Sequence, residues 1–268
     1  MDKKGQIAIF VIIAIVLVVS IGLFFAINRG VPILERSEEF NPETFIDKCI
    51  KDEVRDIVDV MLPQGGIVNP TDYKLYNYIK VPYLCKNENY YNIVIWNEQY
   101  DEGFEITPYS CVTQYPAYLK RLEREIEENV YDKIESCYVS LETTLIERGY
   151  EVSRGDITID ATLKPGIIET VVEGKMAYSK VEVSKSFESF NVLTRSPLYE
   201  VGSVANEIAS QEANYCHFSE DGFMFLYRDY GIQKYMFSDS TKIYTIEHKP
   251  TGATMNIATR GCVISPGF

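Results

Sequence analysis

A continuous apolar run dominates the start of the chain. From Gln6 to Ile27 the sequence holds no charged residue, and a helix of that length covers roughly the 30 Å hydrocarbon core of a bilayer. A secretory signal peptide would have a shorter apolar region and a small-residue cleavage site, which the exit sequence LFFAINRG lacks. A buried core helix would need a domain wrapped around it. The pattern therefore predicts a transmembrane helix over residues 6–27.

Charges on either side of this run indicate its orientation. Lys3 and Lys4 precede it, and Arg29 follows it closely. Because positive residues favour the cytoplasmic side of a membrane, we expect a cytoplasmic N-terminus and an extracytoplasmic chain from about residue 30. The lipid bilayer would then be the partner of residues 6–27.

Helical spacing returns after a short break. Gly30 and Pro32 are expected to end the first helix, since proline lacks a backbone donor. Asn41 followed by Pro42 is typical of a helix N-terminus, with an N-cap residue and a proline at the first helical position. The predicted helix extends to Met61, because apolar residues recur at helical spacing at Ile46, Ile50, Val54, Ile57 and Met61.

The middle of the chain predicts two strands and a second helix. The segments LYNYIKVPYLC (75–85) and NYYNIVIW (89–96) have the composition of strands. The second helix is marked by apolar residues at Leu119, Leu122, Ile126, Val130 and Ile134. Several acidic residues fall mostly outside this stripe and are expected to form a solvated face: Glu123, Glu125, Glu127 and Glu128. A shorter helical piece is expected near residues 141–147.

Beyond the second helix the hydrophobic period changes to two. Apolar and polar residues alternate from Ile157 to Leu163, which is typical of a half-buried strand. Pro165-Gly166 and Gly174 can each reverse the chain. The pattern predicts an antiparallel meander of three or four strands over residues 155–193.

The remaining elements complete an α+β organisation. A third helix is expected from Ser196 to Asn214, and the segments KIYTIEH and TMNIATR predict a terminal hairpin. About three helices set against antiparallel strands make an α+β domain. The expected organisation is a cytoplasmic tip and transmembrane helix in residues 1–30, a linker in residues 31–41, and an extracytoplasmic α+β domain in residues 42–268.

Composition restricts the partners of this domain. The net charge of −13 repels phosphate backbones, so nucleic-acid binding is disfavoured. The chain also holds 20 tyrosines, whose apolar rings and polar tips suit half-buried sheets and binding surfaces alike. Packing is the default explanation for them.

Six cysteines are dispersed beyond the apolar run. Metal sites usually bring cysteines together in close pairs or with histidines, but no C-x-x-C motif occurs and the chain has 2 histidines. An even number of cysteines in an ectodomain indicates three disulfides, for which fifteen connectivities are possible. We favour pairs that close a local loop, join two helices and hold the C-terminal part: Cys85–Cys111, Cys49–Cys137 and Cys216–Cys262.

Motifs of common catalytic sites are absent from the sequence. It contains no G-x-S-x-G, H-E-x-x-H, G-x-x-x-x-G-K-[ST] or G-x-G-x-x-G motif. His217 stands beside Cys216, but neighbours in sequence point in different directions and a disulfide explains Cys216 better. Ser219 to Gly222 lacks the ligand pattern of a calcium loop and predicts a turn. A pair of carboxylates as in a glycosidase stays open, since the fold sets its spacing. We predict no catalytic residue, no metal and no cofactor.

The N-terminal sequence KKGQIAIFVIIAI resembles the class III signal sequence of archaeal type IV pilin-like proteins. In that family a membrane peptidase cuts after the glycine, and the apolar helix becomes the core of a filament. The resemblance implies processing between Gly5 and Gln6 and self-association through the same helix. Two features depart from the pattern. Phe10 stands where bacterial pilins usually carry a glutamate, and Gly30 with Pro32 breaks a helix that is typically continuous.

The layout also resembles uncharacterised archaeal single-span membrane proteins. Their first helix carries a cysteine, as FIDKCIKDEV does here, and a second cysteine follows another helix, as in KIESCYVSLE. The resemblance supports pairing of Cys49 with Cys137. It implies no particular activity.

Three functions follow as expectations. The first is a non-enzymatic, membrane-anchored protein of the cell surface, whose acidic, disulfide-stabilised ectodomain binds an unknown extracellular partner or has a structural role. The alternative is a subunit of a type IV pilin-like surface filament, processed between Gly5 and Gln6. The third is an anchored extracytoplasmic hydrolase.

Overall fold

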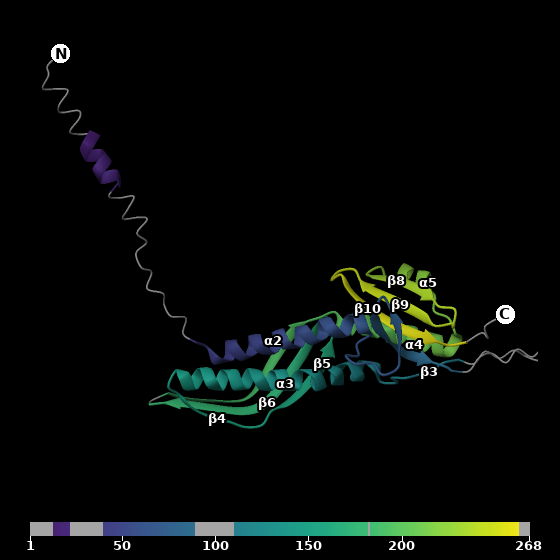
Figure 1. Cartoon of the computed structure of the whole chain (residues 1–268), viewed down its shortest axis with the longest axis horizontal. Coiled ribbons are helices and arrows are strands. Elements are labelled where there is room, and N and C mark those ends of the chain that lie inside the picture. The colour runs from purple at the N-terminus through teal and green to yellow at the C-terminus, as the bar shows by residue number, and fades with distance from the viewer. Residues whose placement is uncertain (1–12, 22–39, 89–109, 182, 263–268) are drawn as a thin grey trace, which may run out of the picture. The chain divides into compact units, whose positions relative to one another are not determined.

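The computed structural model describes residues 13–21, 40–88, 110–181 and 183–262 (Figure 1). The chain divides into two compact units, Met1–Pro42 and Glu43–Phe268. The strand predicted over residues 89–96 lies outside the described residues.

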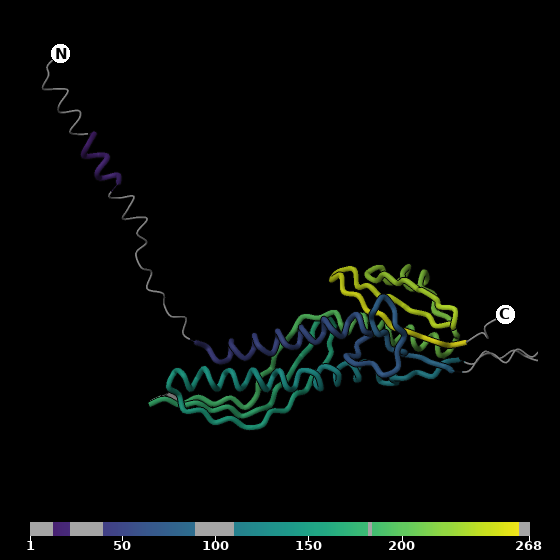
Figure 2. Tube along the Cα trace, viewed as in Figure 1, coloured from purple at the N-terminus to yellow at the C-terminus, as the bar shows by residue number. Residues whose placement is uncertain are grey.

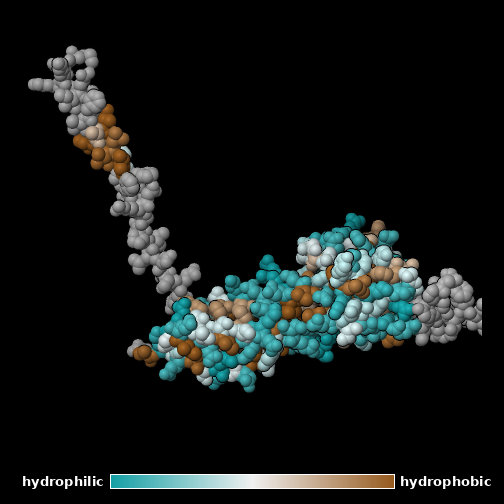
Figure 3. Space-filling view, in the orientation of Figure 1, coloured by the Kyte–Doolittle hydropathy of each residue, from teal (hydrophilic) through white to brown (hydrophobic). Residues whose placement is uncertain are grey.

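In the first unit, residues 13–21 form a helix with exposed apolar side chains, seen as a brown patch in Figure 3. Among the described residues, no helix combines the length and the apolar character needed to cross a membrane. The prediction of an N-terminal transmembrane helix over residues 6–27 is therefore wrong. The helix that the structure describes reaches only about 14 Å at 1.5 Å per residue, and the rest of that segment lies outside the described residues.

The second unit is α+β, and it begins with a helix that the apolar spacing predicts. Helix α2 (Pro42–Met61) has the expected bounds. Its stripe is buried, with Ile46, Ile50 and Val54 at 0% exposure. A short 3-10 helix, η1 (Leu62–Gln64), follows, and it ends at Gly65 in a left-handed conformation.

Helix α3 (Tyr118–Glu147) lies beside α2, as Figures 1 and 2 show. A disulfide between Cys49 and Cys137 joins the two helices. The separate helical piece expected after Cys137 is the last part of α3. It continues the helix because Leu141 and Leu145 extend the same buried stripe.

A four-stranded antiparallel sheet follows α3. Three of its strands lie in the region predicted as a meander, residues 155–193, with the last extending to Arg195, and the fourth, at residues 151–154, was not predicted. β6 is its central strand and pairs with β4 and β5 along one edge and with β7 along the other. Its buried face carries Ile168, Val172 and Met176, all at 0% exposure. The strands are β4 (Glu151–Arg154), β5 (Thr158–Lys164), β6 (Ile167–Lys180) and β7 (Val183–Arg195).

Strand β6 runs on through Gly174, where a reversal was expected. A Cβ atom at Gly174 would lie 2.7 Å from Cγ2 of Ile157, and the pairing with β7 shifts register between Glu173 and Met176. Glycine here permits close packing and an irregularity inside a long strand. Val181, with φ of +51°, follows the end of β6 before the chain continues into β7.

The second sheet has mixed directions. Its order is β1-β2-β10-β9-β8, with β3 paired to β2. β2 and β10 are parallel, whereas the other pairs are antiparallel, so the expectation of antiparallel strands alone is corrected. The strands are β1 (Tyr73–Tyr76), β2 (Ile79–Lys86), β3 (Val112–Thr113), β8 (Tyr230–Met236), β9 (Lys242–His248) and β10 (Ala253–Arg260).

Two helices accompany this sheet. α4 (Leu198–Tyr215) confirms the third predicted helix and packs against β2, β9 and β10. α5 (Glu220–Leu226) packs against β8, and Ser219 caps its N-terminus by accepting a hydrogen bond from the Gly222 amide. The hairpin predicted at the end of the chain is β9–β10.

The single strand predicted over residues 75–85 is in fact part of a hairpin. Asn77 and Tyr78 both have positive φ angles, +47° and +65°, and separate β1 from β2. Two successive left-handed residues are typical of a tight hairpin turn. The strand-like composition continues through the turn, so the pattern alone did not reveal it.

The ends of β1 and of the β8–β9 connection come together on one side of the sheet. Lys74 Nζ lies 2.6 Å from Asp239 Oδ2, and the Tyr76 and Phe237 rings are 6.4 Å apart. The core beneath these rings consists of Val81, Tyr83, Ile243 and Ala258. Because β1 and β8 are at opposite ends of the strand order, these contacts require the sheet to curve.

Candidate functional site

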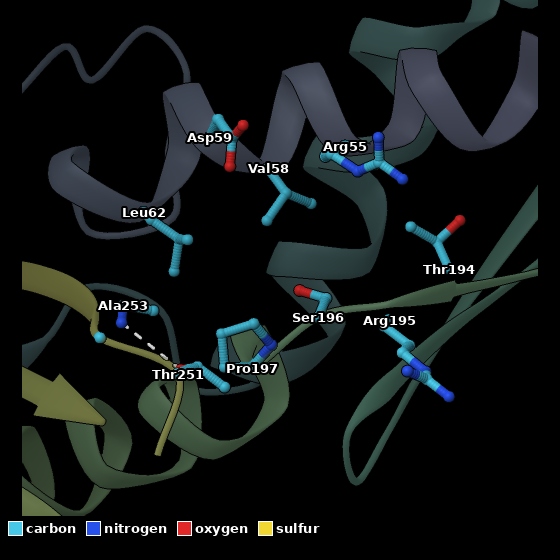
Figure 4. A pocket seen from close by; sticks show the side chains of 11 residues that line it. Arg55, Val58, Asp59, Leu62, Thr194, Arg195, Ser196, Pro197, Thr251 and Ala253 are labelled. Atoms are coloured by element: carbon cyan, nitrogen blue, oxygen red, sulfur yellow. Dashed lines mark hydrogen bonds between the residues drawn. The ribbon is translucent and has the colours of Figure 1, made fainter. Parts of the chain in front are cut away.

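A pocket of about 290 Å³ lies where α2, the β7–α4 junction and the β9–β10 turn meet (Figure 4). α2 contributes its last turns, and the chain between β7 and α4 forms the opposite wall. Such a concave, partly apolar space is the usual form of a small-molecule site. It is lined by Arg55, Val58, Asp59, Leu62, Thr194, Arg195, Ser196, Pro197, Thr251, Gly252 and Ala253.

The charged groups of the pocket do not converge. Figure 4 shows Arg55 directed toward Thr194 and Arg195 directed away from both. Arg55 Nη1 also lies 3.3 Å from Asp52 Oδ1 on the same helix. Among the described residues that line the pocket, Asp59 alone carries a carboxylate. Glycoside hydrolysis usually needs two carboxyl groups, so this lining gives the expected hydrolase no specific support.

The hydroxyl groups of the pocket take part in local structure. Ser196 Oγ accepts a hydrogen bond from the Leu198 amide at 3.2 Å, at the start of α4. Thr251 Oγ1 lies 2.9 Å from His248 Nδ1 within the β9–β10 turn. Thr194 is 3% exposed, and its hydroxyl has no hydrogen-bond partner within the described part of the chain. The pocket can hold a small polar ligand, but it does not present an activated nucleophile.

Three disulfides link the second unit, so the expectation of disulfide bonds is confirmed. Cys49–Cys137 joins α2 to α3, with Cα atoms 6.1 Å apart. Cys85–Cys111 has a Cα separation of 5.3 Å. Cys216–Cys262 joins the end of α4 to the chain beyond β10 at 5.7 Å. These are the pairs that the sequence favoured.

The structure does not bring the other predicted site residues together in one site. Gly5 and Gln6 lie outside the described residues, so their processing stays a prediction. Across residues 13–21, 40–88, 110–181 and 183–262, no group of three or more His, Cys, Asp or Glu residues could hold a metal ion. His217 is exposed, and the sulfur of its neighbour Cys216 is engaged in a disulfide.

The acidic face predicted for α3 is partly buried. Glu123 and Glu125 are 7% and 3% exposed. Glu123 Oε1 accepts the Leu163 amide at 3.0 Å, and Glu127 Oε1 accepts the Ala161 amide at 2.9 Å. The carboxylates thus satisfy backbone donors along the edge of β5 that does not pair with β6. No pattern in the local sequence indicates that these glutamates are buried, because their partners on β5 lie 34 and 40 residues further along the chain.

A buried charged cluster lies at the end of α4, and no pattern in the sequence indicated it. The Glu212 carboxylate is fully buried and accepts two hydrogen bonds from Lys242 Nζ, at 2.9 and 2.7 Å. The Tyr244 hydroxyl donates to Glu212 Oε1 at 2.5 Å. Burial raises the pKa of Tyr244 well above its usual range, and the nearby Glu212 charge raises it further. Every group in this cluster has a partner, which is typical of a structural network.

Tyrosines occur both in the core and on the surface. Tyr138 and Tyr244 are 0% exposed, whereas Tyr78 is 98% exposed and Tyr235 is 52% exposed. Tyr235 packs edge-on against Phe237 at a centroid distance of 4.9 Å, where β8 ends. Packing therefore explains some of the tyrosines and leaves others available for contacts.

Comparison with known proteins gives no family. No family model matches the chain, and neither the curated proteins nor the solved structures contain a match. The structure defines a class only at a coarse level, an α+β protein stabilised by three disulfides.

Proposed function

We propose that this chain is an extracytoplasmic protein whose acidic α+β domain has a binding or structural role and catalyses no reaction. The three disulfides are the observation that carries the proposal. Disulfides persist in oxidising compartments, whereas cytosolic thiols are kept reduced. The large negative charge of the chain supports a partner that is neither nucleic acid nor an anionic surface.

The energetic role of the disulfides supports the same compartment. Each native disulfide of a secreted domain typically contributes about 2–5 kcal/mol to stability. That amount is comparable with a large part of the whole free energy of unfolding of a domain, about 5–15 kcal/mol. A chain that depends on three such links would lose much of its stability in a reducing cytosol.

The test is the thiol state and the accessibility of the native protein. Cells are treated with a membrane-permeant alkylating agent before lysis, and the tryptic peptides are then weighed without reduction. We expect no alkylated cysteine and cleavage of the domain by protease added to intact cells. Six alkylated cysteines, or complete protection from protease in cells whose envelope is intact, would contradict the proposal.

A filament subunit is the second candidate, and one observation favours it. The described helix of residues 13–21 exposes apolar side chains on all sides, with exposures between 51% for Ile13 and 70% for Val18. Removing such an apolar surface from water is favourable by roughly 25 cal/mol per Å². Packing against copies of the same helix would cover it, as the resemblance of the N-terminus to pilin-like proteins implies.

Two measurements test this candidate. A native N-terminal peptide that begins at Gln6 would support processing, whereas one that begins at Met1 or Asp2 would count against it. The variant Ala14→Glu introduces a charge into the exposed apolar helix and should abolish assembly. The control Thr143→Glu, on the exposed face of α3, should assemble normally. Equal assembly of both variants would rule out packing through this helix.

A further inference from the structure

One disulfide differs from the other two in its surroundings. Cys216–Cys262 joins the C-terminal end of α4 to the chain just beyond β10, and both of its residues are only half-buried. In Cys85–Cys111 both residues are buried, at 0% and 5% exposure. In the third disulfide Cys137 is 2% exposed and Cys49 is half-buried. Cys216–Cys262 is thus the disulfide in which both residues are half-buried, and we expect a thiolate from solution to reach it most easily.

The backbone at this disulfide is also unusual. Cys216 has φ of +57° and Cys262 has φ of +52°, and none of the other four cysteines adopts a positive φ. The left-handed region is unfavourable for an L-residue because Cβ crowds the carbonyl oxygen. Such conformations persist where the surrounding structure holds them. Cys216 is the C-cap of α4, and its amide donates to the Glu212 carbonyl at 3.0 Å.

The rest of the fold keeps the end of α4 in place independently of the sulfur atoms. Lys242 Nζ donates to the Cys216 carbonyl at 2.8 Å and to the Glu212 carboxylate. Phe218 is 1% exposed and packs edge-on against Tyr244 at 5.9 Å. Breaking the disulfide therefore releases residues 261–262 while the end of α4 stays attached to β9.

We propose that Cys216–Cys262 is a redox-sensitive latch that a dithiol opens before the other two disulfides react. One thiolate of the dithiol attacks a sulfur of the pair, forms a mixed disulfide and expels the other cysteine as a thiolate. The second thiol of the reagent, once deprotonated, attacks the mixed disulfide and expels the remaining cysteine. The dithiol is oxidised by two electrons, the protein disulfide is reduced by the same two electrons, and residues 261–262 are released.

The test is the rate of reduction of the native protein with dithiothreitol as the probe. The full chain is incubated with reduced dithiothreitol, samples are quenched by alkylation at successive times, and the peptides are digested and weighed. We expect Cys216 and Cys262 to be reduced at least tenfold faster than Cys85 and Cys111. Reduction of the three disulfides together, or earlier reduction of either other disulfide, would overturn the proposal.

Hydrogen exchange of designed variants separates local release from unfolding. The double variant Cys216→Ser/Cys262→Ser should exchange faster at residues 259–262 and remain protected in α2 and α3. The matched variant Cys85→Ser/Cys111→Ser should show faster hydrogen exchange in β2 and unchanged exchange at the end of α4. If the first variant loses protection throughout the domain, the disulfide is a global support and the latch is wrong. These outcomes do not depend on the compartment proposed above.

Discussion

Two glycines show how much of the fold is set by single positions. Gly66 and Gly166 have nearly the same φ, +76° and +75°, but a Cβ atom would lie 2.0 Å from Leu122 Cδ2 at Gly66 and would meet nothing within 4 Å at Gly166. The substitution Gly166→Ala should therefore lower the free energy of unfolding only by the cost of placing an alanine in the left-handed region, about 1–2 kcal/mol. Gly66→Ala should cost about 1–3 kcal/mol more, because it overpacks the core.

Urea unfolding of the two alanine variants checks this expectation. Gly166→Ala is the matched control, since it carries the same backbone cost without the collision. Equal losses of unfolding free energy would show that the core around Leu122 yields to an extra methyl group. The sequence predicted a turn at Gly166, but no local pattern could show that Gly66 touches the core at Leu122.

Buried tyrosines should make the domain sensitive to alkali. Burial raises the pKa of Tyr118, Tyr138 and Tyr244 above the usual range. In the unfolded chain these hydroxyls ionise near pH 10, while the folded state holds them neutral. Their contribution to stability is therefore complete below about pH 10 and is lost as the pH rises above it. Each group lowers the free energy of unfolding by about 1.4 kcal/mol per pH unit in that range.

The variant Tyr138→Phe provides the control for this pH dependence. Its hydroxyl is buried and has no hydrogen-bond partner among the described residues, so stability at pH 7 should change little. Above pH 10 the loss of unfolding free energy should be less steep than in the unmodified chain. Urea unfolding at pH 8, 10 and 11 measures both slopes, and identical slopes would contradict the role of Tyr138.

At the scale of elements, α3 protects an edge of its neighbouring sheet. Glu123, at 7% exposure, accepts the Leu163 amide of β5. The substitution Glu123→Ala leaves that donor without its partner and should destabilise the domain by about 1–3 kcal/mol. Faster hydrogen exchange of the Leu163 amide should accompany the loss.

Glu128 supplies a control on the same helix. Its side chain is 53% exposed and lies 3.7 Å from Arg121 Nη1, so Glu128→Ala should change stability by no more than about 0.5 kcal/mol. An unchanged Leu163 amide in Glu123→Ala would show that the carboxylate does not protect the strand. If Glu128→Ala loses as much unfolding free energy as Glu123→Ala, the loss comes from weakening helix α3 and not from the contact with Leu163.

Elements with a regular period were predictable, and those that depend on distant partners were not. The stripes of α2 and α3 are visible because helical spacing places apolar residues on one face. The alternation from Ile157 to Leu163 likewise predicted β5. The hairpin at Asn77 was missed because its flanking residues are strand-like on both sides. The acidic face of α3 was misjudged because a local pattern cannot show that a strand edge lies opposite it.

At the scale of the whole molecule, α3 connects the two sheets of the second unit. The Tyr118 hydroxyl donates to the Gly65 carbonyl at 2.7 Å, next to the mixed sheet, while the Glu123 and Glu127 side chains reach β5. The parallel pairing of β2 with β10 brings Tyr83 opposite Ala258. Hydrophobic periodicity could identify both strands, but their adjacency depends on contacts across most of the chain.

The Cys49–Cys137 link acts at this largest scale, since it closes a loop across 88 residues between α2 and α3. Chain entropy predicts that Cys49→Ala/Cys137→Ala lowers the free energy of unfolding by about 4.6 kcal/mol. The shorter link, Cys85–Cys111, spans 26 residues, and its removal should cost about 3.5 kcal/mol on the same basis. Urea unfolding of both double variants measures which of them loses more unfolding free energy. A larger loss for the shorter loop would show that local packing around Cys85, which is 0% exposed, outweighs the constraint on the unfolded chain.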